Sequence, residues 1–191
     1  MREQVIENDQ VDMVVATYTI NDARKERISF AGPYYEAGQQ IMTTTDNSTI
    51  TGPDSLRENP DQTVCSVTGS TPSEQIKPYL ADPGQLVLFD QYSQCADALG
   101  NGQVQAVTTD NVILLGFVSE SDGAYKLVGE QFTEEPYGIG ITMGDVPFCE
   151  FVNEQLTQAS ESGAYEEAWT STAGQVEGAE TPTLPTLDTC S

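Results

Sequence analysis

The sequence predicts an α/β protein of two lobes with sheets rich in parallel strands, and three observations lead to this prediction. Short apolar runs rich in β-branched residues alternate with helix signals, as in strand–helix–strand units. Stretches that contain proline and glycine interrupt this alternation at 33–38 and at 134–141. The residues between these stretches have strand–helix repeats of their own, so they form an insert with two connections to the rest of the chain. Such an insert is expected where a pair of crossing strands joins two lobes.

Short apolar runs mark the strands. We expect buried strands at 11–16, 64–67, 86–89 and 104–107, and extended chain at 39–45. The expected boundaries place lobe 1 at 1–38 and 136–175, lobe 2 at 39–135, and a C-terminal tail rich in threonine and proline at 176–191.

Capping residues mark the helices. Asn21 or Asp22 is expected to cap a short helix through Arg24, and Ser93 a helix that ends at Gly100. A last helix is expected over 160–169, weakened by its internal glycine.

The charge balance excludes several classes of function. Seven basic residues against thirty acidic ones give a net charge of −23, and the chain has no histidine. A nucleic-acid binder needs clustered basic side chains, so that class is excluded. Catalysis by Ser-His-Asp or Cys-His and zinc sites built on histidine are excluded as well. No apolar run is long enough to span a bilayer, and no signal-peptide pattern follows Met1. We therefore expect that export information was removed or that the chain begins downstream of its natural start.

Cys65, Cys95, Cys149 and Cys190 are widely spaced and contain no CxxC pair, which disfavours a zinc site. Their number is compatible with two disulfides in an oxidising compartment, and equally with four unrelated thiols. No metal or other cofactor is expected.

A strand-to-helix turn at Thr68, Gly69, Ser70 and Thr71 is the first candidate site. Thr71 is expected as the N-cap of a helix that starts with Pro72 and has Glu74 at its third position. Exposed N–H groups and a helix dipole would suit a carboxylate here. The alternative is an ordinary capped strand–helix junction.

Two further candidates lie at the ends of predicted strands, where open α/β sheets bind ligands. Arg24 follows the first strand and could hold a carboxylate with its fork of donors, although a surface arginine paired with one of the many acids is the alternative. Asp110 ends another strand and could pair with an ammonium group, cap a helix over 111–118, or do both. Together the three candidates would suit an acidic amino acid.

The run from Val11 to Arg24, followed by Phe30 to Tyr35, resembles family-3 extracellular solute-binding proteins, which serve polar amino-acid importers. Their pattern here is D-x-x-x-A-x-x-T-I-T-x-x-R followed by F-S-x-P-Y. Matches at 68–71, at Asp110 and at 135–139 follow in the same order, and the resemblance covers about residues 1–170. The nearest likeness is to glutamate-binding lipoproteins of actinobacteria.

The resemblance implies a periplasmic-binding-protein-like fold and assigns roles to single residues. Arg24 would clamp the α-carboxylate of the ligand, and Thr19 would add its hydroxyl and its N–H. The carbonyl of Thr17 and the carboxylate of Asp110 would bind the α-ammonium. Thr68 and Thr71 would receive carboxylate oxygens. Hinges near 36–42 and 134–138 would let the lobes close over the ligand, and the closed form would dock on a membrane permease.

The sequence departs from the family in two places. Family members carry an opening βαβ segment before the position of Met1, so lobe 1 is expected to be incomplete. Some relatives have a basic residue where Val67 stands, which leaves glutamate, aspartate and glutamine as alternative ligands.

The resemblance also implies an extracytoplasmic protein, lipid-anchored in its full-length form, monomeric and without enzymatic activity. In that setting Cys65–Cys95 is the first expected disulfide, and Cys149–Cys190 would tie the tail to lobe 1. One alternative is an enzyme on this fold, similar to cyclohexadienyl dehydratase. Another is a truncated fragment that binds no ligand, preceded in its gene by a signal peptide with a lipid-attachment cysteine.

Overall fold

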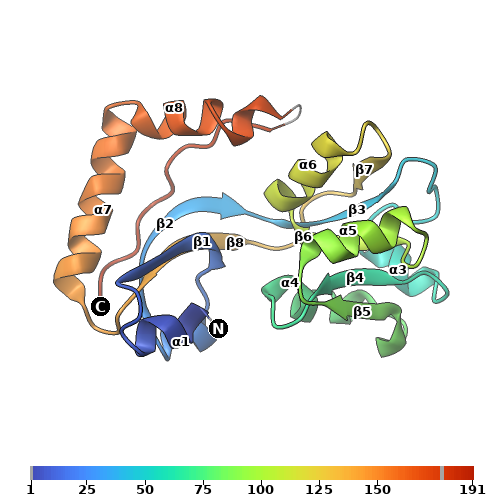
Figure 1. Cartoon of the computed structure of the whole chain (residues 1–191), viewed down its shortest axis with the longest axis horizontal. Coiled ribbons are helices and arrows are strands. Elements are labelled where there is room, and N and C mark those ends of the chain that lie inside the picture. The colour runs from blue at the N-terminus through green and yellow to red at the C-terminus, as the bar shows by residue number, and fades with distance from the viewer. Residues whose placement is uncertain (1, 177–178) are drawn as a thin grey trace. The chain divides into compact units, whose positions relative to one another are not determined.

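The computed structural model describes residues 2–176 and 179–191, which fall into two compact units (Figure 1). Among these residues, unit 1 holds 2–37, 135–175 and 180–191, and unit 2 holds 38–134 with Val176 and Ala179. The chain passes from one unit to the other after Ala37 and returns after Glu134. None of the described helices is long and apolar enough to cross a membrane.

Unit 1 is built on an antiparallel sheet of three described strands in the order β1-β8-β2. Its elements are α1 (Arg2–Glu7), β1 (Met13–Thr19), α2 (Asp22–Lys25), β2 (Ser29–Ala37), β8 (Glu135–Ile141), α7 (Val146–Glu161), α8 (Ala164–Thr170) and the 3-10 turn η3 (Ala173–Gln175). Successive strand residues point to opposite faces, so the sheet has a core on each face. Phe30 packs with Ile6 of α1 on one face, whereas Ala31 packs with Cys149 and Val152 of α7 on the other.

Two glycines of β8 make the α1-side core possible. A Cβ on Gly138 would lie 2.6 Å from Ile20 Cγ1, and a Cβ on Gly140 would lie 2.9 Å from the Tyr18 ring. Both glycines therefore leave the volume that Tyr18 and Ile20 fill.

Unit 2 is a mixed sheet of five described strands in the order β5-β4-β6-β3-β7. Its elements are β3 (Gln39–Thr44), α3 (Asp54–Glu58), β4 (Val64–Val67), α4 (Thr71–Gln75), the 3-10 turns η1 (Lys77–Tyr79) and η2 (Pro83–Gln85), β5 (Leu86–Phe89), α5 (Tyr92–Gly100), β6 (Ala106–Asp110), α6 (Asn111–Glu120) and β7 (Tyr125–Val128). Strand β4 pairs in parallel with β5 and β6, whereas β3 is antiparallel to β6 and β7. Alternate residues again enter two cores: Val64 packs with Leu56 and Ile76, and Cys65 packs with Leu99 and Leu114.

The predicted α/β class is confirmed, with parallel pairing confined to β4, β5 and β6. The expectation of a buried strand at 11–16 is wrong in its burial. Strand β1 begins at Met13, and Val11, Met13 and Val15 are 39%, 48% and 57% exposed. Their alternate neighbours Val14 and Ala16 pack against the α1-side core. Helix α7 packs on β2 and not on β1, so the second face of β1 is less covered.

Two helix predictions also need correction. The expected helix over 160–169 is divided at Gly163, whose φ of 79° ends α7 and precedes α8. Helix α5 starts one residue before Ser93, and its N-terminus is closed by the side chain of Gln94, which accepts the N–H of Gln91 at 3.1 Å. For α2 the cap is Asn21, one of the two expected candidates.

Both expected disulfides are present. Cys65–Cys95 joins β4 to α5 inside unit 2, and Cys149–Cys190 joins α7 to the C-terminal segment of unit 1. That segment is held further by the N–H of Asp188, which donates to Gly32 O at 2.7 Å. The Ser29 hydroxyl also donates to Ser191 O at 3.1 Å.

Candidate functional site

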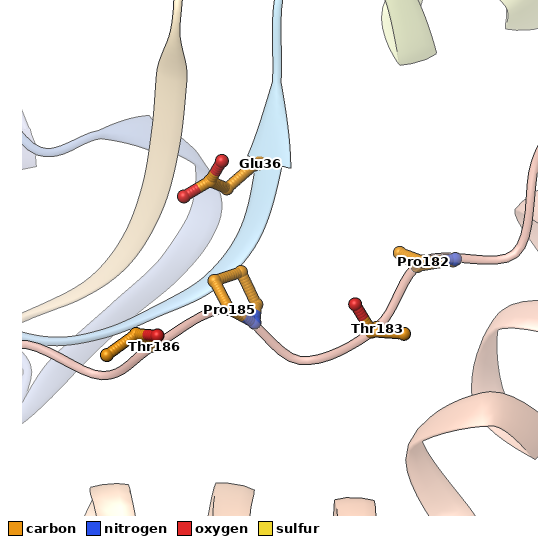
Figure 2. Close-up of a pocket in the computed structure, with 5 residues that line it drawn as sticks. All are labelled: Glu36, Pro182, Thr183, Pro185 and Thr186. Atoms are coloured by element: carbon orange, nitrogen blue, oxygen red, sulfur yellow. The ribbon is translucent and has the colours of Figure 1, made fainter.

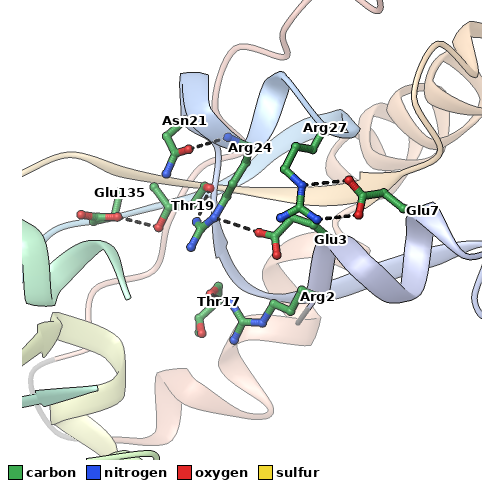
Figure 3. Close-up of polar contacts among 9 residues, drawn as sticks. All are labelled: Arg2, Glu3, Glu7, Thr17, Thr19, Asn21, Arg24, Arg27 and Glu135. Atoms are coloured by element: carbon green, nitrogen blue, oxygen red, sulfur yellow. Dashed lines mark hydrogen bonds and ion pairs between the residues drawn. The ribbon is translucent and has the colours of Figure 1, made fainter. Parts of the chain in front are cut away.

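Arg24 is the best-defined member of the candidate site. Asn21 caps α2 by accepting the N–H of Arg24 at 2.9 Å, which places Arg24 in the first turn after β1. The side chain then folds back, and Nη1 donates to Thr19 O at 2.5 Å. Nε lies 3.4 Å from Glu3 Oε1 of α1 (Figure 3). The guanidinium lies over the Tyr18 ring, 4.8 Å from its centroid. The side chain is only 15% exposed. Arg24 thus pairs with one of the acidic residues, Glu3, as the alternative expected, but it is largely buried and does not lie at the surface.

Burial lowers the pKa of Arg24 from its usual value, and the nearby Tyr18 and Glu3 oppose this effect. An arginine remains protonated at neutral pH. The group is thus a desolvated cation in a fixed orientation, which is how proteins hold carboxylates with paired hydrogen bonds.

Thr19 ends β1 beside Arg24. Its hydroxyl donates to Glu135 Oε2 at 2.5 Å, and Glu135, the first residue of β8, is fully buried (Figure 3). The resemblance implied that this hydroxyl would contact a ligand carboxylate, whereas in the structure it donates to the carboxylate of Glu135. This contact ties the end of β1 to the start of β8.

Thr17 has a different neighbour from the one expected. Its carbonyl accepts a hydrogen bond from Arg2 Nη1 at 2.9 Å, and the Arg2 guanidinium also lies over the Tyr18 ring, at 5.1 Å. A positive charge at this carbonyl disfavours an ammonium group there, because like charges repel. The expected contact of this carbonyl with the α-ammonium stays a prediction.

In unit 2, the turn after β4 places the other expected anion ligands. Thr68 is exposed and its N–H donates to Phe89 O at 2.9 Å. Gly69 has a φ of 71°, in the left-handed region that glycine tolerates. The N-cap is Ser70 rather than Thr71: the Ser73 N–H donates to Ser70 Oγ at 3.2 Å.

The expected capping box of Thr71 and Glu74 does not form. Thr71 is the first helical residue and Pro72 the second, and Glu74 instead pairs with Lys77 at 2.5 Å. Helix α4 has only five residues, so its dipole is much weaker than expected for a full helix. Any anion at this turn would depend on hydroxyl and N–H groups.

Asp110 is the last residue of β6 and is 4% exposed. It occupies the N-cap position of α6, as the alternative expected, although its side chain makes no capping hydrogen bond. Asn111 holds the adjoining chain by donating its N–H to Gly38 O at 2.8 Å. Since β4 and β6 are parallel, Asp110 and the turn after β4 follow the same edge of the unit 2 sheet.

Gln39 joins these two parts of unit 2 and was missed by the sequence analysis. It is fully buried and pairs with Asp110 in the β3–β6 ladder. Its Nε2 donates to Pro72 O at 3.0 Å and to Thr108 Oγ1 at 2.8 Å. No local signal sets Gln39 apart, because β3 also contains Gln40, Thr43 and Thr44. Its burial is what gives the amide its polar partners.

Sequence reasoning also missed the residues that surround Arg24, namely Arg2, Glu3, Tyr18 and Glu135. Tyr18 lies on β1 near Arg24 in the chain, whereas Arg2 and Glu3 come from α1 and Glu135 from β8, so no local motif groups all four. Burial and the Glu3 carboxylate raise the pKa of Tyr18, burial being the larger cause. Within the described ranges, no group of histidine, cysteine and carboxylate residues could hold a metal ion.

A pocket of about 370 Å³ lies elsewhere in unit 1, between β2 and the C-terminal segment (Figure 2). Its lining residues are Glu36, Pro182, Thr183, Pro185 and Thr186. Glu36 supplies a negative charge and no basic side chain lines the pocket, so it does not suit an anionic ligand. It contains none of the candidate residues.

Comparisons with known proteins agree with this fold. The model of the bacterial extracellular solute-binding proteins, family 3, matches residues 1–171. The glutamate-binding protein GluB of Corynebacterium efficiens is 39% identical over 180 residues, which cover 91% of this chain and 60% of the relative. The ABC transporter glutamine-binding protein GlnH of Bacillus subtilis is 34% identical over 168 residues, which cover 88% of this chain and 60% of the relative.

Among solved structures, an ancestral arginine-binding protein bound to glutamine superimposes with a TM-score of 0.81 at 30% identity, covering 93% of this chain and 76% of that one. The chain thus spans 60% of the length of the two curated relatives. The match to the family model extends over most of the chain, and the chain belongs to the bacterial extracellular solute-binding proteins of family 3.

Proposed function

We propose that this chain is the amino-acid-binding component of an ABC importer and that its ligand is glutamate. The observation that carries the proposal is the orientation of Arg24, held by Thr19 O at 2.5 Å, by Glu3 and by the Tyr18 ring. A planar guanidinium fixed in this way binds a carboxylate through two parallel hydrogen bonds. The α-carboxylate of an amino acid is the proposed partner.

Unit 2 would supply the complementary groups. Asp110 is a buried carboxylate and would pair with the α-ammonium. The turn formed by Thr68, Gly69, Ser70 and Thr71 would donate to the side-chain carboxylate through hydroxyl and N–H groups. One ligand must engage both Arg24 and Asp110 under this proposal, so Asp110→Asn should weaken binding as Arg24→Ala does.

The relatives support glutamate or glutamine as the ligand class, since GluB binds the former and GlnH the latter by name. We favour glutamate because the similarity to GluB is the greater. Binding without chemical turnover is part of the proposal, as are an extracytoplasmic and monomeric protein, docking on a permease, and a lipid anchor on the full-length protein. Two disulfides support an oxidising compartment.

A thermal-shift titration with glutamate, aspartate, glutamine and cystine tests the proposal. A ligand at a hundredfold excess over its dissociation constant stabilises the folded state by about 2.7 kcal/mol. We expect a selective shift with glutamate and recovery of the ligand unchanged. A cooperative transition without any shift would refute glutamate binding by this chain, and loss of glutamate with time would favour an enzyme.

Arg24→Ala is the decisive variant, with Arg27→Ala as its matched control. Arg27 lies three residues away but pairs with Glu7 at the surface, with Nε 2.8 Å from Glu7 Oε1. Calorimetry should show no glutamate binding for Arg24→Ala and unchanged affinity for Arg27→Ala. Equal affinities in both variants would defeat the assignment of Arg24.

A further inference from the structure

Glu3 lies beside Arg24, the proposed carboxylate-binding residue, although Glu3 is negatively charged like the ligand carboxylate. It belongs to the first turn of α1, its side chain is 14% exposed, and its Oε1 is 3.4 Å from Arg24 Nε (Figure 3). A carboxylate in this position repels an anionic ligand. Its presence therefore needs another explanation.

The contacts of Arg24 indicate what that purpose is. A guanidinium has five N–H donors in a rigid plane and can receive a carboxylate along its Nε edge or at its Nη end. Glu3 takes the Nε edge, Thr19 O takes one donor of Nη1, and the Tyr18 ring covers one face. Among the described residues, no further polar contact occupies the Nη end, which can receive a second carboxylate.

We propose that Glu3 is a positioning residue: it holds the Nε edge of Arg24 so that the Nη end meets the ligand carboxylate. The inference rests on the proposed function and deepens it, since it names the edge of Arg24 that the ligand uses. It also explains why a negatively charged side chain is placed beside a site for an anion.

The charge state of Glu3 fits this role. Burial would raise the pKa of Glu3, but a backbone hydrogen bond, the Tyr18 hydroxyl and the charge of Arg24 together lower it below its usual value. Glu3 is therefore an anion at neutral pH and a full partner of Nε. The contact is an ion pair between two largely buried side chains, with Oε1 3.4 Å from Nε.

Two conservative variants separate positioning from simple electrostatics. Glu3→Gln keeps the reach and an acceptor oxygen but removes the charge, whereas Glu3→Asp keeps the charge but shortens the side chain by one methylene. If Glu3 positions Arg24, Glu3→Gln should retain the affinity for glutamate within about twofold, and Glu3→Asp should weaken it about tenfold. The reverse order, or tighter binding by Glu3→Asp, would overturn the proposal.

Glu7→Asp is the matched control, because Glu7 lies on the same helix and pairs with Arg27 instead. Its affinity for glutamate should equal that of the wild type. A loss as large as that of Glu3→Asp would mean that any change in α1 disturbs the site, and would overturn a specific role for Glu3.

A spectroscopic measurement keeps this inference separate from the proposed function. The Nε–H resonance of Arg24 in a ¹⁵N spectrum should be observable and slow to exchange in the wild type, in Glu3→Gln and in Glu7→Asp, and lost in Glu3→Asp. This readout needs no ligand. If the wild type binds no amino acid, the proposed function fails, while the resonance still reports whether Glu3 holds Arg24. An unchanged resonance in Glu3→Asp would refute the positioning role itself.

Discussion

The Thr19 hydroxyl shows how a single polar atom can hold the end of a strand. It donates to the fully buried Glu135 at 2.5 Å, and a buried carboxylate that loses a donor is destabilised. We expect Thr19→Val to lower the free energy of unfolding by about 1–3 kcal/mol, as for other charged hydrogen bonds lost in a core.

Thr17→Val is the matched control for this prediction. Thr17 uses its carbonyl, which the substitution keeps, to accept from Arg2. Urea unfolding should show a much smaller change for Thr17→Val than for Thr19→Val. Equal losses would indicate that the β-branched substitution, and not the hydroxyl, is responsible.

The lowered pKa of Glu3 predicts a pH dependence with a definite sign. The folded state binds a proton at Glu3 less readily than the unfolded state, so this group stabilises the fold above its unfolded pKa, near 4.5. The contribution disappears as the pH falls through the folded value. Thermal unfolding of the wild type and Glu3→Gln should therefore differ at neutral pH and converge in acid. A difference that grows in acid would contradict the prediction.

At the scale of elements, the glycines of β8 leave space for the side chains that pack against this strand. A Cβ at Gly138 would lie 2.6 Å from Ile20 Cγ1 and 2.7 Å from Phe30 Cδ1, both in a packed core. We expect Gly138→Ala to destabilise unit 1 by about 1–3 kcal/mol, the usual cost of overpacking.

At Gly69 a Cβ meets nothing within 4 Å, so Gly69→Ala should cost only the left-handed backbone strain of about 1–2 kcal/mol. Denaturation curves with ligand binding recorded alongside would distinguish the two.

The two disulfides should act on different elements. Cys65 and Cys95 are both fully buried and close a loop between residues separated by 30 positions, so Cys65→Ala with Cys95→Ala should lower stability by about 3–4 kcal/mol. Cys149→Ala with Cys190→Ala should release mainly the C-terminal segment. Hydrogen exchange at the Asp188 amide, which donates to Gly32 O, would become fast in the second pair of variants and stay slow in the first. Fast exchange in both would contradict this division.

Elements with local signals were predictable from the sequence, and contacts between distant elements were not. The α/β class and the cap at Asn21 both follow from residues a few positions apart. The exposure of Met13 and Val15 did not, because an apolar run looks the same on an edge strand as on a central one. The N-cap at Ser70 was misassigned because neighbouring hydroxyl residues compete for that position.

The same limit applies to the candidate site. Arg24 and Asp110 could be identified from their place after strands, and the resemblance supplied the rest. Glu3 and Glu135 could not, since each reaches the end of β1 from a separate element. Only the folded chain brings such residues together.

At the scale of the whole molecule, the net charge of −23 should slow the capture of an anion. Salt screens this repulsion, and the Debye length falls to about 10 Å at 0.1 M. We expect the association rate constant for glutamate to rise about two- to fivefold between low and physiological ionic strength. Glutamine, which carries no net charge, is the control and should show no such rise in stopped-flow measurements. A falling rate for glutamate would mean that the local field of Arg2 and Arg24 dominates.

The C-terminal segment is attached to unit 1, and this allows the separation of the two units to be measured. Ser191 accepts from Ser29, and Cys190 is bonded to Cys149, so a fluorophore attached after Ser191 would be carried by unit 1. The exposed Asn101, at the end of α5, offers an attachment point on unit 2. Energy transfer between dyes at these two positions would follow the separation of the units in solution as amino acids are added.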